Sequence, residues 1–536
     1  MKAQTPKEVT YKFLLPNPGM EQAMLDALRA LGCEVQSQRT INQEDLYLDT
    51  FDWRLFRHDW SLRFSRTAGK AHYTLKSLRA VKGAPEERQE ITCAAGGNIR
   101  APWDLKETEI LGKISEIIYP RRLLGHVAVR ARRRTAKVIH PDGTEAEIAF
   151  TSFTFQAEGL QKPVSCRLFG SEIELTKGTA ATLEAMTKNL AAAFTLLPFP
   201  QSILEAAIER LGITFPVKNP PPELVVSAAD RLDLAVKKLL SFQLHRLQEN
   251  VPGTLADSDT EFVHQARVAT RRMRSLLRLF ADAVPKRSAD YFSGELLWLG
   301  SLLGAVRDLD VFSLNLANRF GNGIALAPPR ALSSLLRQIQ EERAGRLTDL
   351  IEGLSSTRCR IFLLRISTFA TRKPAIHPLA PLALSPVGQI APGVIYGLFN
   401  KVISRGGLIL LKPKIRNFHK LRIQFKKLRY ASEFFNPAFD GALSPFIADA
   451  VKIQDCLGEL QDTVFTKELI VGLLKKWRGR VMAPRLIFVL GEIHQLQQEI
   501  ARSRQAEFKA IWKQFDCAET LLKLTQALGM DNPPEA

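Results

Sequence analysis

Hydrophobic and polar positions follow two different periods along the 536-residue chain. Up to about residue 215, apolar residues alternate with polar ones in short runs, which is typical of strands with one buried face. Two stretches of helical period, 20–31 and 182–196, lie between these runs. The pattern predicts an α+β unit built on an antiparallel sheet. The alternating runs are 9–13, 62–64, 73–75, 147–150 and 153–155.

Beyond this region the hydrophobic period changes to 3.6 residues, with almost no alternation. The clearest stretches are 228–248, 261–280 and 446–476, and they predict an all-helical unit. Several prolines between the two regions predict a stiff, non-helical connector. We therefore expect one domain over 1–213, a proline-rich linker over 214–226 and a helical domain over 227–525.

Two segments of the helical region repeat in the same order. VHQARVATRRMR at 263–274 recurs as FHKLRIQFKKLR at 418–429. A second motif, with Gly304 and Asp308, recurs further along with Gly458 and Asp462. The matching order predicts a duplicated helical unit. We expect two related helical bundles, at about 227–370 and 400–525.

Each copy of the repeat places its cations on one helix face, opposite the apolar residues. Solvated helix faces usually mix charge signs, because like charges four residues apart repel each other. These two basic rows contain no acidic residue, so they favour a polyanionic partner over a merely solvated face. The first row is His264, Arg267, Arg271, Arg274 and Arg278, and the second is His419, Arg422, Lys426 and Arg429.

The remaining residues of the repeat suggest supporting roles. A histidine at the head of each row suits a phosphate site whose affinity rises on protonation, and the alternative is a histidine that donates to a carbonyl. Gly304 and Gly458 are expected to allow close helix packing. Asp308 and Asp462 are expected to pair with cations of the repeat rather than to act in catalysis.

The charge balance supports this division of the chain. The sequence has 74 Lys and Arg against 55 Asp and Glu, a net charge of +19. Residues 1–215 contribute 29 against 25, a net of +4, and residues 216–536 contribute 45 against 30, a net of +15. Single-stranded nucleic acid sites usually interleave cations with aromatic residues. Because only Tyr430 lies near the rows, a phosphate chain without bases fits better than RNA.

Other classes of protein are disfavoured. The six cysteines are far apart and form no CxxC pair, so we expect neither a disulfide framework nor a zinc site. The first ten residues lack the apolar core of a signal peptide. Five prolines in the uncharged stretch 374–400 are expected to interrupt a membrane-spanning helix. We expect a cytoplasmic protein without a membrane partner.

The helical motifs resemble the CHAD family over about 225–525. Its pattern of His, Arg at +3, basic residues at +7 and +8 and a later LG-x-x-x-D is matched in both halves. The resemblance implies two four-helix bundles around a basic groove that binds inorganic polyphosphate. The residues that it implies for binding are His264, Arg267, Arg271, Arg272, Arg274, Arg307, His419, Arg422, Lys426, Lys427, Arg429 and Tyr430.

The first 210 residues resemble the CYTH family, the triphosphate tunnel fold. The motifs are YLDT at 47–50, T-x-K at 74–76, E-x-E at 172–174 and partial matches at 8–12, 62–65 and 88–92. The resemblance implies an antiparallel β-tunnel whose inward cations hold phosphate. The implied phosphate-binding residues are Lys12, Arg63, Lys76, Arg88, Arg130 and Arg132.

Alternate residues of a strand share one face, so inward carboxylates could hold Mg²⁺ or Mn²⁺ beside the phosphates. The candidate ligands are Glu8, Glu90, Glu147, Glu172 and Glu174, with internal pairing to cations as the alternative. Threonine replaces an acid that the family commonly has, and Ser65 stands in place of a second arginine. We therefore expect anion binding to be better preserved than metal-assisted hydrolysis. The threonines are Thr10, Thr92, Thr151 and Thr176.

The leading hypothesis is a cytoplasmic, non-catalytic or weakly catalytic protein that binds polyphosphate and associates with polyphosphate granules. The competing hypothesis is an Mg²⁺-dependent inorganic triphosphatase that acts in the tunnel. A third is an RNA-associated protein. No catalytic residue is assigned from the sequence.

Overall fold

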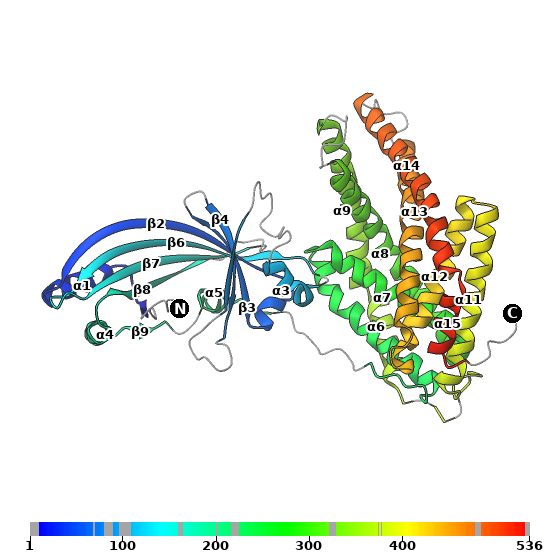
Figure 1. Cartoon of the computed structure of the whole chain (residues 1–536), viewed down its shortest axis with the longest axis horizontal. Helices are drawn as coiled ribbons and strands as arrows, with labels where there is room; N and C mark the ends of the chain where they lie inside the picture. Colours follow the sequence, from blue (N-terminus) through cyan, green and yellow to red (C-terminus); the bar gives the residue numbers. More distant parts are fainter. Residues whose placement is uncertain are drawn as a thin grey trace. The chain divides into compact units, whose positions relative to one another are not determined.

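The computed structural model describes most of the chain in two compact units, Met1–Val217 and Lys218–Ala536. Figure 1 shows the first unit as a curved sheet with short helices and the second as a set of long helices. The fold class predicted from the sequence is confirmed for both units. The described residues are 10–67, 70–79, 89–95, 109–119, 121–158, 165–199, 202–215, 224–320, 329–373, 375–376, 378–476 and 484–530.

The first unit is built on a nine-stranded antiparallel sheet with the order β5-β4-β3-β2-β6-β7-β8-β1-β9. The long strand β2 was not predicted, because much of it is polar on both faces. Its inward residues line a polar cavity and therefore do not alternate with hydrophobic ones. The strands are β1 (Thr10–Leu15), β2 (Glu34–Asp49), β3 (Trp60–Thr67), β4 (Lys70–Ser77), β5 (Glu90–Ala94), β6 (Leu124–Ile139), β7 (Glu145–Ala157), β8 (Ser165–Lys177) and β9 (Leu197–Pro198).

Helices cover both faces of this sheet. α1 (Met20–Ala30) and α4 (Ala180–Phe194) form one core with Ala136 and Val138 of β6. α5 (Ile203–Leu211) forms another core with Val127 and Val129 of the same strand. Because 129 and 136 differ by an odd number, these cores lie on opposite faces of β6. The odd-numbered residues of β6 therefore face inward.

The YLDT motif anchors a short helix. Asp49 accepts hydrogen bonds from the backbone N–H groups of Thr50, Leu55 and Phe56 at 2.6, 2.9 and 2.9 Å. Burial raises the pKa of this carboxyl to about 6. These bonds fix the start of α2 (Arg54–Arg57). The next helix along the chain, α3 (Glu109–Ile118), comes after β3, β4 and β5. The aspartate of the motif thus has a structural role.

The second unit is helical, as predicted. Its two sets of five helices, α6–α10 and α11–α15, pack against each other through a shared hydrophobic core. The second set begins at Val387, ahead of residue 400. The helices are α6 (Leu232–Leu255), α7 (Thr260–Leu279), α8 (Lys286–Phe320), α9 (Pro329–Ser355), α10 (Thr357–Thr371), α11 (Val387–Leu411), α12 (Ile415–Phe435), α13 (Ser444–Lys476), α14 (Pro484–Phe515) and α15 (Ala518–Ala527).

The prolines of 374–400 do not prevent a long apolar helix, contrary to expectation. Pro386 lies at the N-cap of α11, and Pro392 is accommodated inside the helix near its start. Among the described helices, α11 is long and apolar enough to cross a membrane by length and composition alone. One such helix is weak evidence for a membrane span. Ala391, Ile395 and Val402 of α11 pack in the core of the unit. All six cysteines are unpaired.

Candidate functional site

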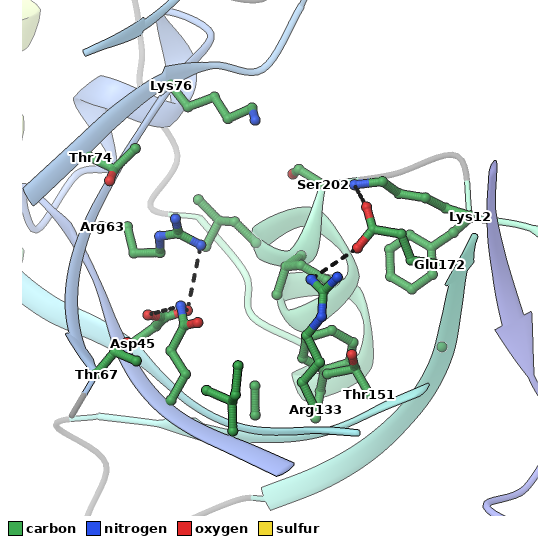
Figure 2. Close-up of a pocket in the computed structure, with 18 of the residues that line it drawn as sticks. Lys12, Asp45, Arg63, Thr67, Thr74, Lys76, Arg133, Thr151, Glu172 and Ser202 are labelled. Carbon is green, nitrogen blue, oxygen red and sulfur yellow. Dashed lines mark hydrogen bonds and ion pairs between the residues drawn. The ribbon is translucent and has the colours of Figure 1, made fainter. Parts of the chain in front are cut away.

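A cavity of about 810 Å³ lies on the inward face of the sheet. Residues from β1, β2, β3, β4, β6, β7 and β8 line it, together with the start of α5. Five cations and three carboxylates face this space, which we call the sheet cavity (Figure 2). The cations are Lys12, Arg39, Arg63, Lys76 and Arg133, and the carboxylates are Asp45, Glu147 and Glu172.

Ion pairs cross one side of the sheet cavity. Glu172 on β8 lies 2.8 Å from Nζ of Lys12 and 3.2 Å from Nη1 of Arg133. Glu147 on β7 lies 3.4 Å from Nη2 of the same arginine. Figure 2 shows Glu172 between its two cationic partners. These glutamates therefore act as internal counter-ions, the alternative that the sequence left open.

The opposite wall carries a second group of polar contacts. Nη1 of Arg63 lies 3.5 Å from Asp45, which also accepts a hydrogen bond of 2.8 Å from Gln43. Burial raises the pKa of the neighbouring Tyr47 to about 12, so its hydroxyl stays neutral at physiological pH. Lys76 pairs with Glu90 at 2.8 Å, and both side chains are partly exposed to solvent. This wall therefore has buried polar contacts around Asp45 and one solvent-accessible cation, Lys76.

The structure places three of the predicted phosphate-binding residues, Lys12, Arg63 and Lys76, at the sheet cavity. The placement of Arg130 and Arg132 there was wrong. Both have even numbers on β6 and are exposed on the other face, where Arg130 lies 3.6 Å from Glu44. The arginine of β6 that lines the cavity is Arg133.

Two lining cations were missed in the sequence. Arg133 shares its face of β6 with Val127 and Val129, and this two-residue spacing could have identified it. Arg39 lies eight residues before Tyr47 of the YLDT motif, so the same spacing along β2 leads to it. The basic run at 130–134 concealed the correct face, because arginines point to both sides of the strand.

The other candidate tunnel residues have varied positions. Glu8 and Arg88 lie outside the described residues. Glu174 lies two residues beyond Glu172 on the same face of β8, opposite Glu147 of β7. The four threonines also differ: Thr10 is opposite Glu174, Thr92 contacts Thr74 at 3.4 Å, Thr151 lines the sheet cavity and Thr176 donates to the Glu145 carbonyl.

The described carboxylates of the sheet cavity are paired with cations of the chain. Among the residues that the structure describes, no group of three or more His, Cys, Asp or Glu could hold a metal ion. Glu147 and Glu172 both contact the guanidinium of Arg133. A Mg²⁺ or Mn²⁺ ion held by these two residues would require them to leave Arg133.

In the helical unit, α7 and α12 contact each other and bring the two basic rows together. The effect of this convergence is seen at the side chain of Lys426. Its pKa is lowered to about 7, first by burial and then by the charges of nearby arginines on both helices. We call the central group the basic crossing; it consists of Arg267, Arg271, Arg422 and Lys426.

The two histidines at the heads of the rows differ. Burial and the charges of Arg307, Arg271 and Arg267 lower the pKa of His264 to about 4, so this side chain is neutral at pH 7. His419 is exposed, and its Nδ1 lies 2.5 Å from Oε1 of Gln461. The predicted protonation near neutrality therefore does not apply to His264 in the free protein.

The repeated glycine and aspartate have distinct roles in the two halves. Arg267 lies 3.5 Å from Asp308, as expected for a supporting pair. A Cβ atom at Gly304 would lie 2.0 Å from Nη1 of Arg267, so this glycine makes room for the guanidinium rather than for another helix. Gly458 has no such neighbour within 4 Å. Asp462 lies near Arg422, and burial raises the pKa of its carboxyl.

Three residues assigned to ligand binding also make contacts inside the protein. Glu433 of α12 lies 2.7 Å from Arg272 and 3.2 Å from Arg429. Tyr430 is only 1% exposed, and its ring packs against Arg271, Arg272 and Arg429 with centroid distances of 5.7, 5.5 and 5.4 Å. The buried ring of Tyr430 therefore supports the three arginines.

The remaining predicted cations surround the basic crossing. Burial and the charges of Arg278 and Arg267 lower the pKa of Arg274 on α7. Arg307 of α8 contributes charge near His264. Lys427, the counterpart of Arg272 in the second repeat, is half-buried on α12. These residues enlarge the positive region around the central four cations.

Comparison with protein families identifies the helical unit. The family model described as the CHAD domain matches residues 238–471, which include both basic rows. The chain carries a CHAD domain. Solved structures similar to this part include the CHAD domain from the plant Ricinus communis, with 22% identity and a TM-score of 0.45 over 60% of this chain and 99% of that one. PptA from Streptomyces chartreusis has 16% identity and a TM-score of 0.43 over 53% and 99%.

Other similar proteins extend beyond the CHAD domain. Uncharacterized proteins from two strains of Mycobacterium tuberculosis are 24% identical over 506 residues, which is 90% of this chain and 92% of theirs. The sheet unit is similar to HpAC1 from Hippeastrum, a putative adenylyl cyclase described as having a dominant triphosphatase activity. That match has 19% identity and a TM-score of 0.27 over 40% of this chain and 100% of HpAC1.

Proposed function

We propose that the CHAD domain binds linear inorganic polyphosphate at the basic crossing. The carrying observation is the convergence of Arg267, Arg271, Arg422 and Lys426 from two helices in contact. Burial, and then the charges of these arginines, lower the pKa of Lys426 to about 7. Burying like charges together is unfavourable unless an anion compensates them. A flexible chain of phosphates supplies several negative charges to such a cluster at once.

The chemistry of the crossing favours phosphate over a ligand with bases. Arginine guanidinium groups form paired hydrogen bonds to phosphate oxygens, and three arginines are available here. Tyr430, the aromatic residue beside the cationic face of the second row, is buried and offers no stacking surface to a base. Asp308 and Asp462 supply fewer charges than the cations require. The proposed ligand is therefore a phosphate chain without bases.

The experiment is calorimetric titration of the full chain with polyphosphate of defined length. We expect affinity to fall as salt rises, by analogy with counterion release from nucleic acids. Arg271→Ala combined with Lys426→Ala should weaken binding at least tenfold. Lys373→Ala combined with Lys513→Ala, which removes two exposed cations elsewhere, should leave it within twofold. Equal affinities in both double variants would contradict the proposal.

RNA remains the alternative ligand for the same surface, and competition distinguishes the two. An oligonucleotide should fail to displace polyphosphate at an equal concentration of phosphate groups. Displacement of polyphosphate by the oligonucleotide would show that the basic crossing binds nucleic acid. For the cellular setting, we propose a cytoplasmic protein associated with polyphosphate granules, which fluorescence microscopy of the tagged chain would test.

A second candidate function, hydrolysis of tripolyphosphate, is favoured by the sheet cavity. Its five cations outnumber its three carboxylates, and its volume is about 810 Å³. A metal-dependent reaction would require Glu147 and Glu172 to exchange Arg133 for the ion. Phosphate release during a titration with Mg²⁺ or Mn²⁺, abolished by Glu172→Gln, would support the triphosphatase function. Absence of release at every metal concentration would exclude it.

A further inference from the structure

An apolar and basic tip joins α11 to α12. Within the nine residues 408–416, four large hydrophobic side chains are exposed to solvent. Three exposed cations are interleaved with them: Lys412, Lys414 and Arg416. We call this segment the 408–416 tip. The exposed fractions are 55% for Leu408, 43% for Leu410, 79% for Leu411 and 51% for Ile415.

The tip has a defined shape. The backbone N–H of Lys412 donates to the carbonyl of Leu408 at 2.9 Å, and that of Lys414 donates to the carbonyl of Lys412 at 2.8 Å. The side-chain amide of Asn417 donates to the same carbonyl of Lys412 at 2.9 Å. These bonds hold the turn between the helices, so its leucines are displayed on an ordered segment.

Charge along the chain on both sides of the tip has a single sign. Residues 353–432 contain 15 Lys and Arg and no Asp or Glu. A groove of about 250 Å³ beside the tip has an apolar floor that includes Leu410 and Phe418. Its charged lining residues are Arg502 and Lys509 of α14. Hydrophobic side chains surrounded by cations match the boundary between acyl chains and anionic headgroups of a lipid surface.

We propose that the 408–416 tip binds the surface of anionic lipid membranes. Leu408, Leu411 and Ile415 would enter the acyl boundary, and Lys412, Lys414 and Arg416 would contact the headgroup phosphates. A symmetric contact with a second copy would bring these cations against one another, which is unfavourable. The inference is independent of polyphosphate binding, and it departs from the expectation that the protein has no membrane partner.

The experiment is co-sedimentation of the full chain with vesicles of phosphatidylglycerol and phosphatidylcholine in equal parts. We expect the protein to pellet with these vesicles and not with phosphatidylcholine alone. Leu408→Ser combined with Leu411→Ser should reduce binding at least tenfold. Lys412→Glu combined with Lys414→Glu should do the same through the headgroup contacts. Failure of the unaltered chain to pellet with anionic vesicles would overturn the proposal.

Two controls separate the tip from other surfaces. Leu364→Ser combined with Leu379→Ser changes residues that are 69% and 91% exposed elsewhere, and it should leave binding unchanged. Arg271→Ala combined with Lys426→Ala should also retain vesicle binding. Loss in either control would overturn the assignment to the tip. Loss of self-association by the leucine variant, with vesicle binding unchanged, would assign the tip to contacts between copies and contradict the proposal.

Discussion

Arg272 on α7 and Glu433 on α12 form an ion pair, with Nη2 of the arginine 2.7 Å from Oε2 of the glutamate. The same carboxylate contacts Arg429 at 3.2 Å. The first contact joins the two helices of the basic rows, and the second lies within α12. Two cations that the sequence assigned to polyphosphate therefore already have a protein anion as partner, and their removal should affect folding before ligand binding.

This relationship predicts the effect of Arg272→Ala. The change leaves Glu433 with one cationic partner at a half-buried position, which should lower the free energy of unfolding by about 1–3 kcal/mol. Polyphosphate affinity should change less than about threefold, because Arg272 is not part of the basic crossing. Chemical denaturation and calorimetric titration measure the two effects. A large loss of affinity with unchanged stability would place Arg272 among the ligand contacts.

Lys426→Met should have the opposite effects. In the folded chain the pKa of Lys426 is about 7, below its ordinary value of 10.5. Between pH 7 and 10.5 the unfolded chain therefore binds more protons than the folded chain, so the free energy of unfolding rises with pH in this window. Below pH 7 the side chain is charged in both states, and the cost of burying that charge is greatest. Replacement should raise the free energy of unfolding near pH 6 by about 1–3 kcal/mol and abolish most polyphosphate binding. A loss of stability would show that Lys426 stabilises the fold.

The same lysine predicts pH-dependent binding. Above about pH 7 the free side chain is neutral and must take up a proton when polyphosphate binds, so affinity should fall by up to about tenfold per pH unit. Lys426→Arg retains its charge and should flatten this dependence. Titrations at pH values from about 6 to 9 provide the measurement. A profile that is identical in the two proteins would assign the titration to another group.

The sheet cavity predicts a contrast between adjacent arginines. Arg133→Ala should weaken tripolyphosphate binding about tenfold, because Arg133 lines the cavity, an effect equivalent to about 1.4 kcal/mol. Arg132→Ala, on the outer face of the same strand, is the matched control and should have little effect. Glu172→Gln should tighten metal-free binding by releasing Lys12 and Arg133. Equal effects of the two arginine variants would place the ligand outside the cavity.

The helical periods carried much of the functional information in the sequence. A period of 3.6 residues assigns each cation of α7 and α12 to a face, so both basic rows could be recognised before their convergence was known. The partners of Arg272 and Tyr430 could not be predicted, because they depend on how α7 packs against α12. Burial of the tyrosine ring beneath three guanidinium groups is a tertiary property with no local signal.

The sheet was harder to interpret for two physical reasons. β2 has polar residues on both faces, so the alternation that marks a half-buried strand is absent. On β6, arginines at 130, 132, 133 and 134 point to both faces, and a shift of one residue exchanges the inner and outer sets. Pairing with β7, which sets Arg133 opposite Thr151, resolves this ambiguity.

The most direct test of the account is the affinity of the full chain for polyphosphate when the basic crossing alone is removed. We predict that Arg267→Ala, Arg271→Ala, Arg422→Ala and Lys426→Ala together abolish measurable binding while the helical content is retained. A control with four exposed cations replaced away from α7 and α12 should bind as the unaltered chain does. Equal binding by the crossing variant and the control would contradict the account.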